Sequence, residues 1–422
     1  MLIYSEKISP RIEYAVEVLF KPWYPNAVIT SDLGKSVSYD GPVICYNHEN
    51  NIPNSIWIKP SGLLFETTHS SAEPGTNTWK GLPSLFPVTS EIPFDVLAAT
   101  FYLVSRYEEY NKEAGRDELG RFLASTSFAF RNNFLDRPLV DEWRHALVEI
   151  IEEKWTASSQ QTEYKEILSI DIDSAFAYKH KGFKRTLGGF GLDIVNLRFG
   201  NFIRRLSTLL GFRADDFDTY DHILQVQKTS GINVIWFFLL ADYNKHDINV
   251  PYTSEPLRKL ITKLDGKGQV GIHPGVKSNG DLPCLKKEIN RLVEITRRPC
   301  LNSRQHYLVM RFPETYRNLY SSGIRHDYTM GYADQPGFRA STSFAFRWYD
   351  LSNEEITNLY VHPFSYMDIT FRHYQNLSSS ETEIRIADLK NKVQKTRGVF
   401  ISLWHNESFS NLGKWKNWKP KM

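Results

Sequence analysis

The sequence predicts an α/β protein in which a closed or nearly closed (β/α) barrel follows a smaller α/β unit. From residue 166 onward, apolar runs typical of buried strands alternate with helical patterns. Such alternation favours parallel strands joined by crossover helices. About seven or eight strands of this kind close, or nearly close, a barrel. The length of 422 residues is too great for one ordinary domain. A doubly wound open sheet is the alternative architecture.

The first 155 residues are predicted to form the smaller unit, an accessory α/β domain. Its helical patterns lie at 11–20, 95–110 and 140–154, and its strand-like runs lie at 43–46 and 55–58. The third helix opens with acidic residues, which are favourable at a helix N-terminus. The polar stretch 156–162 is the best candidate for a linker. The larger unit is therefore expected to span residues 165–422.

The larger unit contains eight strand-like runs and four helical patterns. The strands are expected at 166–172, 232–240, 269–272, 299–305, 326–331, 337–341, 358–364 and 398–404. The helices between them are expected at 256–264, 285–297, 314–321 and 381–396.

Composition restricts the class of partner. The chain has 51 Lys and Arg against 48 Asp and Glu, which gives a formal net charge of +3. This charge is small for a nucleic-acid-binding protein, so no nucleic-acid partner is expected. Cys45, Cys284 and Cys300 are widely spaced and form neither a disulfide framework nor a CxxC zinc motif.

Two observations concern membranes. The N-terminal residues lack a basic region followed by an apolar one, and no apolar stretch reaches about 20 residues. We therefore expect a cytoplasmic protein without an integral membrane segment. Residues 193–210 are apolar and basic at roughly helical spacing, which would suit a helix on a membrane surface. We expect instead that this helix packs beside the active site, because its polar face holds few basic residues.

Asp and His side chains recur where strand-like runs end, and this is the most informative feature of the chain. Asp171 and Asp173 end one run, and His273, His306 and His405 end or follow three later ones. Ligands and metals bind at the C-terminal ends of strands in α/β sheets and barrels. One such His would be an ordinary buried residue. Recurrence at four strand ends predicts a single metal site.

The aspartate pair supports a cation. Asp171 and Asp173 lie two residues apart, so in a strand both side chains point to the same face. Two carboxylates that face each other repel unless a cation lies between them, so helix capping is the weaker interpretation. Carboxylate and imidazole ligands suit zinc and similar divalent ions, and Zn²⁺ is the expected cofactor.

The order of these motifs resembles the polysaccharide deacetylase family, also called the NodB-homology or carbohydrate esterase family 4 group. The motifs are GIHP at 271–274, SRQH at 303–306, GYADQPGFRA at 331–340 and LWHN at 403–406. The resemblance covers residues 165–412, and more loosely 1–155, and is greatest to a bacterial branch with an extra N-terminal domain. It implies a distorted (β/α) barrel of the NodB-homology type with one divalent metal at its mouth, where water attacks an N-acetyl carbonyl, and hence a catalytic domain at residues 165–422.

The resemblance implies roles for the metal-site residues. Asp171 corresponds to the general base and Asp173 to a metal ligand, although one residue separates two aspartates that are adjacent in many family members. His273 corresponds to the first metal histidine. The second metal histidine of the family would fall at Lys277, which cannot replace it while protonated. We therefore expect His306 to be a ligand instead.

Three further residues receive roles from the resemblance. Arg339 corresponds to the arginine that pairs with the base carboxylate and orients it. Asp368 corresponds to the carboxylate that supports the catalytic histidine. His405 would be the general acid that protonates the leaving amine.

These assignments predict a metal-dependent hydrolase that removes an N-acetyl group from an amino sugar in a glycan or glycan precursor. One alternative is a hydrolase of a non-sugar, cyclic amide on the same barrel. The others are a non-catalytic sugar-binding protein and a structural partner of surface-glycan biosynthesis proteins. The expected ligand is thus a carbohydrate or small amide, and surface-glycan biosynthesis proteins are the candidate protein partners.

Overall fold

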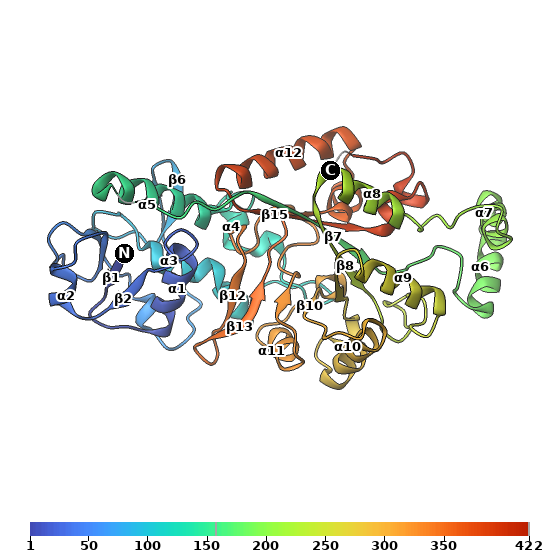
Figure 1. Ribbon diagram of the computed structural model, residues 1–422, viewed down its shortest axis with the longest axis horizontal. Coiled ribbons are helices and arrows are strands. Elements are labelled where there is room, and N and C mark those ends of the chain that lie inside the picture. Colours follow the sequence, from blue (N-terminus) through green and yellow to red (C-terminus); the bar gives the residue numbers. More distant parts are fainter. Residues whose placement is uncertain (157, 421–422) are drawn as a thin grey trace.

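The computed structural model describes residues 1–156 and 158–420 and shows an elongated α/β molecule (Figure 1). The N-terminal part lies at one end, and the helices α6 (Phe183–Val195) and α7 (Phe199–Leu209) lie at the other. The main sheet lies between them. Residue 157 of the predicted linker and residues 421–422 of the predicted catalytic domain lie outside the described residues.

The N-terminal part is built on a four-stranded parallel sheet with the order β2-β1-β3-β4. Its strands are β1 (Leu2–Tyr4), β2 (Val28–Thr30), β3 (Val43–Tyr46) and β4 (Ile56–Ile58). An antiparallel hairpin follows, with β5 (Thr76–Trp79) and β6 (Leu82–Leu85). The helices are α1 (Pro10–Phe20), α2 (Leu33–Val37), α3 (Val96–Val104), α4 (Phe128–Arg131) and α5 (Leu139–Trp155).

The helix predicted at 95–110 is shorter than expected. Asp95 caps α3 by accepting a hydrogen bond from the backbone of Ala98, and α3 ends at Val104. Arg106 then takes a left-handed backbone conformation with φ of 57°, which a continuous α-helix does not permit. The chain continues as the 3₁₀ helix Tyr107–Tyr110.

The main sheet has nine strands in the order β12-β13-β11-β10-β9-β8-β7-β15-β14. The central strands are β7 (Lys165–Ile172), β8 (Asn233–Phe238), β9 (Gln269–Ile272) and β15 (Val399–His405). The others are β10 (Asn302–Ser303), β11 (His326–Asp327), β12 (Phe346–Asp350), β13 (Glu355–Val361) and β14 (Tyr366–Met367). The pairs are parallel except for the antiparallel pair β12–β13.

The strand pairing confirms the α/β class and leaves the barrel unsupported. The hydrogen-bonded order has two ends, β12 and β14, and no pair joins these ends within the described residues. The closed form of the barrel predicted from the sequence is therefore not seen in the pairing.

Helices predicted from periodicity are present in the second part of the chain. They are α9 (Glu255–Asp265), α10 (Leu282–Thr296), α11 (Glu314–Ser321) and α12 (Ser379–Lys395), and α8 (Tyr220–Ser230) is an addition. The predicted strand at 337–341 is wrong. Gly337 and Ser341 both have positive φ, and the Ser341 N–H donates to the Phe338 carbonyl at 2.8 Å, which makes this stretch a turn.

Strand β7 positions the site because its two faces differ. Leu168, Ile170 and Ile172 pack in the large hydrophobic core. Ser169 and Asp171 belong to the other face, as period-two alternation requires, and both are buried. Under that face lies a smaller apolar cluster to which β8 and β15 contribute. The polar ends of the strands therefore rest on a packed apolar base.

The N-terminal part shares the large hydrophobic core with the main sheet. Residues of α1, α3 and α5 belong to the same buried cluster as residues of β12 and β13. The rings of Tyr14 and Tyr349, one from each part, have centroids 5.0 Å apart. The division into an accessory domain at 1–155 and a catalytic domain at 165–422 stays a prediction.

Candidate metal centre

One cavity of about 480 Å³ opens where β7, β9 and β15 end. Five of the residues selected from the sequence line it, namely Asp171, Asp173, His273, His306 and His405. They come from four separate strand–loop junctions between residues 171 and 405. The structure thus brings together side chains that are far apart in the sequence.

Asp173, His273 and His306 form the closest group of potential ligands. One ligand atom from each lies within 4.8 Å of the other two. His273 Nε2 is 3.2 Å from Asp173 Oδ1, and His306 Nε2 is 3.6 Å from Asp173 Oδ2. Oδ1 of Asp173 is buried and has no hydrogen-bond partner. A buried carboxylate oxygen without a partner is unfavourable, and a cation would satisfy it.

Both imidazoles of this group are held by their other nitrogen. His273 Nδ1 lies 2.6 Å from the Arg304 carbonyl oxygen, and His306 Nδ1 lies 2.8 Å from Asp247 Oδ1. These oxygens only accept, so each Nδ1 donates, and Nε2 remains to bind a ligand. A histidine held in this way is typical of metal sites. Two imidazole nitrogens and one carboxylate suit a zinc-type divalent ion.

The imidazole and carboxylate groups of this site each stabilise the charged form of the other. Burial opposes protonation of His306, but the carboxylates of Asp173 and Asp247 outweigh it and raise the pKa of His306 to about 9. Burial likewise opposes ionisation of Asp173, yet the surrounding imidazoles, His306 foremost, hold the pKa of this carboxyl well below its ordinary value. A divalent ion bound here would take the place of these protons.

Asp171 is paired with an arginine other than the predicted one. Arg304 Nη1 donates to Asp171 Oδ1 at 3.0 Å and to Ser169 Oγ at 2.8 Å. Arg304 Nε donates to the Tyr328 carbonyl at 2.9 Å, which fixes the plane of the guanidinium. Oδ2 of Asp171 faces the three potential ligands and lies 3.7 Å from His273 Nε2. One carboxylate oxygen is therefore anchored while the other faces the cavity.

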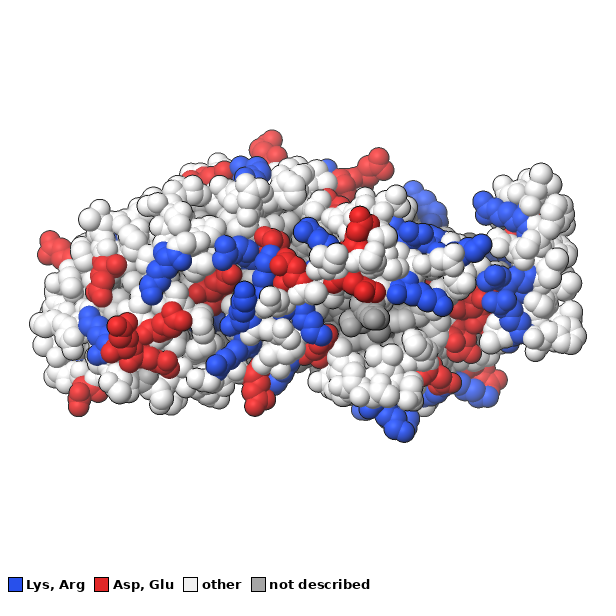
Figure 2. All heavy atoms as spheres, turned by 90° about the horizontal axis from the view of Figure 1, so that it is seen from above, with Lys and Arg blue, Asp and Glu red and all other residues white. Residues whose placement is uncertain are grey.

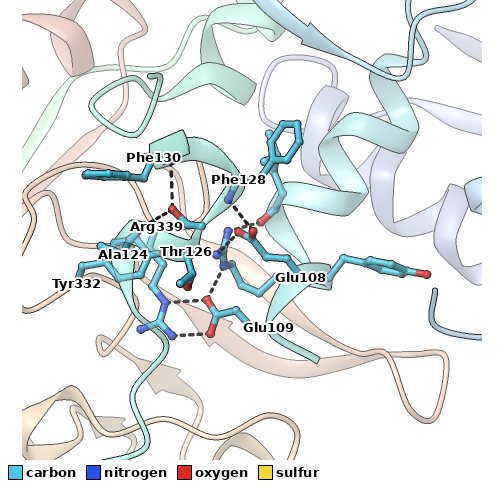
Figure 3. Close-up of polar contacts among 12 residues, drawn as sticks. Glu108, Glu109, Ala124, Thr126, Phe128, Phe130, Tyr332 and Arg339 are labelled. Carbon is cyan, nitrogen blue, oxygen red and sulfur yellow. Dashed lines mark hydrogen bonds and ion pairs between the residues drawn. The ribbon is translucent and has the colours of Figure 1, made fainter. Parts of the chain in front are cut away.

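The assignment of Arg339 to the base carboxylate is wrong. Arg339 donates from Nε and Nη2 to the two carboxylate oxygens of Glu109, at 2.8 and 2.5 Å (Figure 3). It also donates to the Gly331 carbonyl at 3.0 Å. The backbone turn that replaces the predicted strand at 337–341 directs this side chain toward the N-terminal part. Each of the three guanidinium nitrogens of Arg339 thus donates to Glu109 or Gly331 and not to Asp171.

His405 and Asp368 form a hydrogen-bonded pair beside the cavity. His405 Nδ1 is 2.8 Å from Asp368 Oδ1, and Asp368 Oδ2 accepts the backbone N–H of His405 at 2.8 Å. His405 Nε2 faces the cavity, 3.8 Å from Asp173 Oδ2. Burial opposes protonation of His405, but Asp368 and the two cavity aspartates outweigh it and raise its pKa to about 10.

Sequence reasoning missed two residues of this site. Arg304 stands in the SRQH motif two residues before the predicted ligand His306, and this position is the signal that the sequence offers, whereas its burial is seen only in the structure. Asp247 lies in a loop after β8 and had no such signal. Lys277, where the family pattern has its second histidine, is exposed on the 3₁₀ helix Val276–Ser278 and does not line the cavity.

Comparison with known proteins gives one family and several distant structures. Residues 1–156 match the family of unknown function DUF7033. No curated protein matches the chain. A polysaccharide deacetylase from Mycobacterium smegmatis is similar with 11% identity and a TM-score of 0.39, over 59% of this chain and 78% of that one.

Two Bacillus proteins are similar to this chain at about the same low sequence identity. The polysaccharide deacetylase Bc1974 from Bacillus cereus has 9% identity and a TM-score of 0.28, over 58% of this chain and 80% of that one. A pseudoenzyme of carbohydrate esterase family 4 from Bacillus anthracis has 9% identity and a TM-score of 0.28. The match covers 58% of this chain and 57% of that one.

Proposed function

We propose that this chain is a metal-dependent hydrolase that removes the acyl group from the nitrogen of an N-acetylated amino sugar. The observation that carries the proposal is the grouping of Asp173, His273 and His306 within 4.8 Å beside Asp171 and His405, in one cavity. A divalent ion held by the first three would supply positive charge that polarises a carbonyl group and favours ionisation of water.

The remaining residues divide the proton transfers between them. Asp171 accepts the proton of the attacking water at Oδ2, while Arg304 holds Oδ1. His405 donates a proton from Nε2 to the leaving nitrogen, while Asp368 holds Nδ1. A C–O bond forms as the C–N bond breaks, and the products are acetate and a free amine.

The variant Asp171→Asn tests the assignment of Asp171 as the general base. An amide cannot accept the water proton, so acetate release from a short oligomer of N-acetylglucosamine should fall by about 10²- to 10⁴-fold. The zinc content should be unchanged, because Asp171 is not assigned as a ligand. Asp221→Asn is the matched control, since the Asp221 side chain is 82% exposed on α8. Near-wild-type turnover by Asp171→Asn would place the base elsewhere.

A wild-type chain that binds zinc and releases no acetate would contradict the hydrolase proposal itself. Such a chain would favour the non-catalytic sugar-binding alternative, and binding of the same oligomer without turnover would be the positive sign of it.

A further inference from the structure

Helices α6 and α7 form a hairpin, and an aromatic contact and an ion pair join the two helices. The rings of Phe190 and Phe202 have centroids 4.9 Å apart, and Arg205 pairs with Asp193 at 2.8 Å. Figure 1 shows the hairpin standing away from the main sheet at the end of the molecule. The earlier expectation that residues 193–210 pack beside the active site is therefore wrong.

Each helix of the hairpin carries a row of exposed apolar side chains. The rows are Phe183, Leu187 and Ile194 on α6 and Phe199, Ile203 and Leu206 on α7, with exposed fractions from 41% to 78%. Successive spacings of four and seven residues on α6, and of four and three residues on α7, place each row on one helical face. Scattered exposed apolar residues are normal in proteins, but a contiguous group marks an interaction surface.

The hairpin carries more basic than acidic side chains. Residues 183–213 contain six Lys and Arg and a single acidic residue, Asp193, which pairs with Arg205. Arg204 and Arg213 pair with Asp216, which follows the hairpin. Lys184 and Arg198 are exposed, and neither has an ion-pair partner among the residues that the structure describes. In Figure 2 the outer surface at this end is largely uncharged, and basic side chains gather toward the body of the molecule.

The helices are too short to cross a bilayer. They have 13 and 11 residues, and at a rise of about 1.5 Å per residue each is well below the roughly 30 Å of a hydrocarbon core. No helix within residues 1–156 and 158–420 is long and apolar enough to span a membrane. An apolar face bordered by basic residues on a short helix suits the interface between headgroups and acyl chains.

We propose that the hairpin of α6 and α7 docks on a lipid bilayer surface that contains anionic phospholipids. The apolar rows enter the headgroup boundary, and the basic residues contact the phosphate groups. A second copy of the chain fits less well, because self-association would bring two basic hairpins together. Lys181, two residues before α6, lines the cavity of the candidate metal centre, so the start of the hairpin adjoins that cavity although residues 193–210 do not.

Sedimentation of the full chain with vesicles tests docking without reference to catalysis. The wild-type chain should bind vesicles of phosphatidylcholine mixed with phosphatidylglycerol, and binding should weaken as salt rises. The double variant Phe199→Asp/Ile203→Asp should lose about tenfold or more of this binding. Both side chains are more than half exposed, at 59% and 66%, so folding should be preserved, as circular dichroism would verify.

Two further variants separate the apolar and charged contributions. Lys184→Glu/Arg198→Glu should lose a similar factor on the mixed vesicles and little on phosphatidylcholine alone. Ile384→Asp is the matched control and should bind as wild type, because Ile384 is 69% exposed on α12. Absence of wild-type binding to the mixed vesicles, or equal binding by the aspartate double variant, would overturn the proposal. A concentration-dependent dimer that the same variant abolishes would overturn it in favour of a second copy.

Discussion

At the scale of single residues, the candidate site depends on a guanidinium that anchors one oxygen of Asp171. Arg304 is fully buried and contacts Asp171, Ser169 and the Tyr328 carbonyl at 2.8 to 3.0 Å. Its guanidinium also lies over the ring of Phe237, 4.8 Å from the centroid. A planar fork held at several points fixes the carboxylate more firmly than a point charge would. Arg304 is therefore a positioning residue.

Arg304→Lys should keep the positive charge and lose this fixed geometry. We expect kcat for acetate release to fall by about 10- to 100-fold with KM and zinc content little changed. Arg298→Lys is the matched control, because the Arg298 side chain is 61% exposed and lies outside the cavity. Equal kcat in Arg304→Lys and wild type, measured with the variant folded, would remove Arg304 from the proposed mechanism.

The site residues divide into those that strand position predicts and those that loop geometry decides. Asp171, Asp173, His273 and His405 end or follow strands whose apolar runs are plain in the sequence, so their convergence was predictable. The arginine that pairs with Asp171 was not predictable, because the turn at 337–341 directs Arg339 away from the cavity. Positive φ at a non-glycine residue such as Ser341 leaves no sequence signal.

At the scale of elements, α10 supports the loop that follows β9 through a buried glutamate. Glu288 Oε2 accepts the Gly275 N–H at 2.9 Å, two residues after His273. Burial raises the pKa of Glu288 from 4.5 to about 7. The folded chain thus binds a proton more tightly than the unfolded chain. Stability from this group is present below pH 4.5 and is lost as the pH rises through about 7.

Glu288→Gln should remove this pH dependence. The amide oxygen still accepts from Gly275, so the free energy of unfolding of the variant should exceed that of wild type at pH 8, by up to about 3 kcal/mol. At pH 4 the two should differ little. Urea unfolding at the two pH values measures this, with Glu294→Gln on the same helix as control, since its side chain is 51% exposed. A variant less stable than wild type at pH 8 would contradict the assignment of Glu288 as a buried acid.

Identical sequence does not give identical structure in this chain. The octapeptide ASTSFAFR occurs at 124–131 and at 340–347. In the first copy Ser127 caps α4 by accepting the Phe130 N–H. In the second copy the corresponding Ser343 donates to Asp141 at 2.7 Å, and the chain enters β12. Helices with strong periodicity, such as α9 and α11, were predictable, whereas segments of this kind are decided by tertiary partners.

At the scale of the whole molecule, buried ion pairs connect the two parts of the chain. Glu109 accepts from Arg339 (Figure 3). It also accepts from Arg106, and all three side chains are buried. Burial opposes ionisation of Glu109, but the two guanidinium groups outweigh it and lower its pKa to about 2. The stability that results is present above the ordinary value of 4.5 and is lost as the pH falls toward about 2.

Glu109→Gln should destabilise the chain because it leaves the buried guanidinium of Arg339 without a carboxylate, while Arg106 keeps only Glu108. We expect the free energy of unfolding at pH 7 to fall by about 3 to 5 kcal/mol, as for other broken buried pairs. Glu73→Gln is the matched control, since Glu73 pairs with Arg131 at the surface and such pairs contribute about 0 to 1 kcal/mol. An equal decrease in the free energy of unfolding in the two variants would mean that the Glu109 ion pairs do not stabilise the contact between the two parts.

The most direct test of the central claim is a competition titration of zinc against a chromogenic chelator. The wild-type chain should bind about one zinc per molecule. The zinc affinity of His306→Ala should be lower by about 10- to 100-fold or more, because His306 is assigned as a ligand. His222→Ala, with its exposed imidazole on α8, should bind as wild type. Unchanged zinc affinity in His306→Ala, or no zinc binding by the wild-type chain, would contradict a metal centre formed by Asp173, His273 and His306.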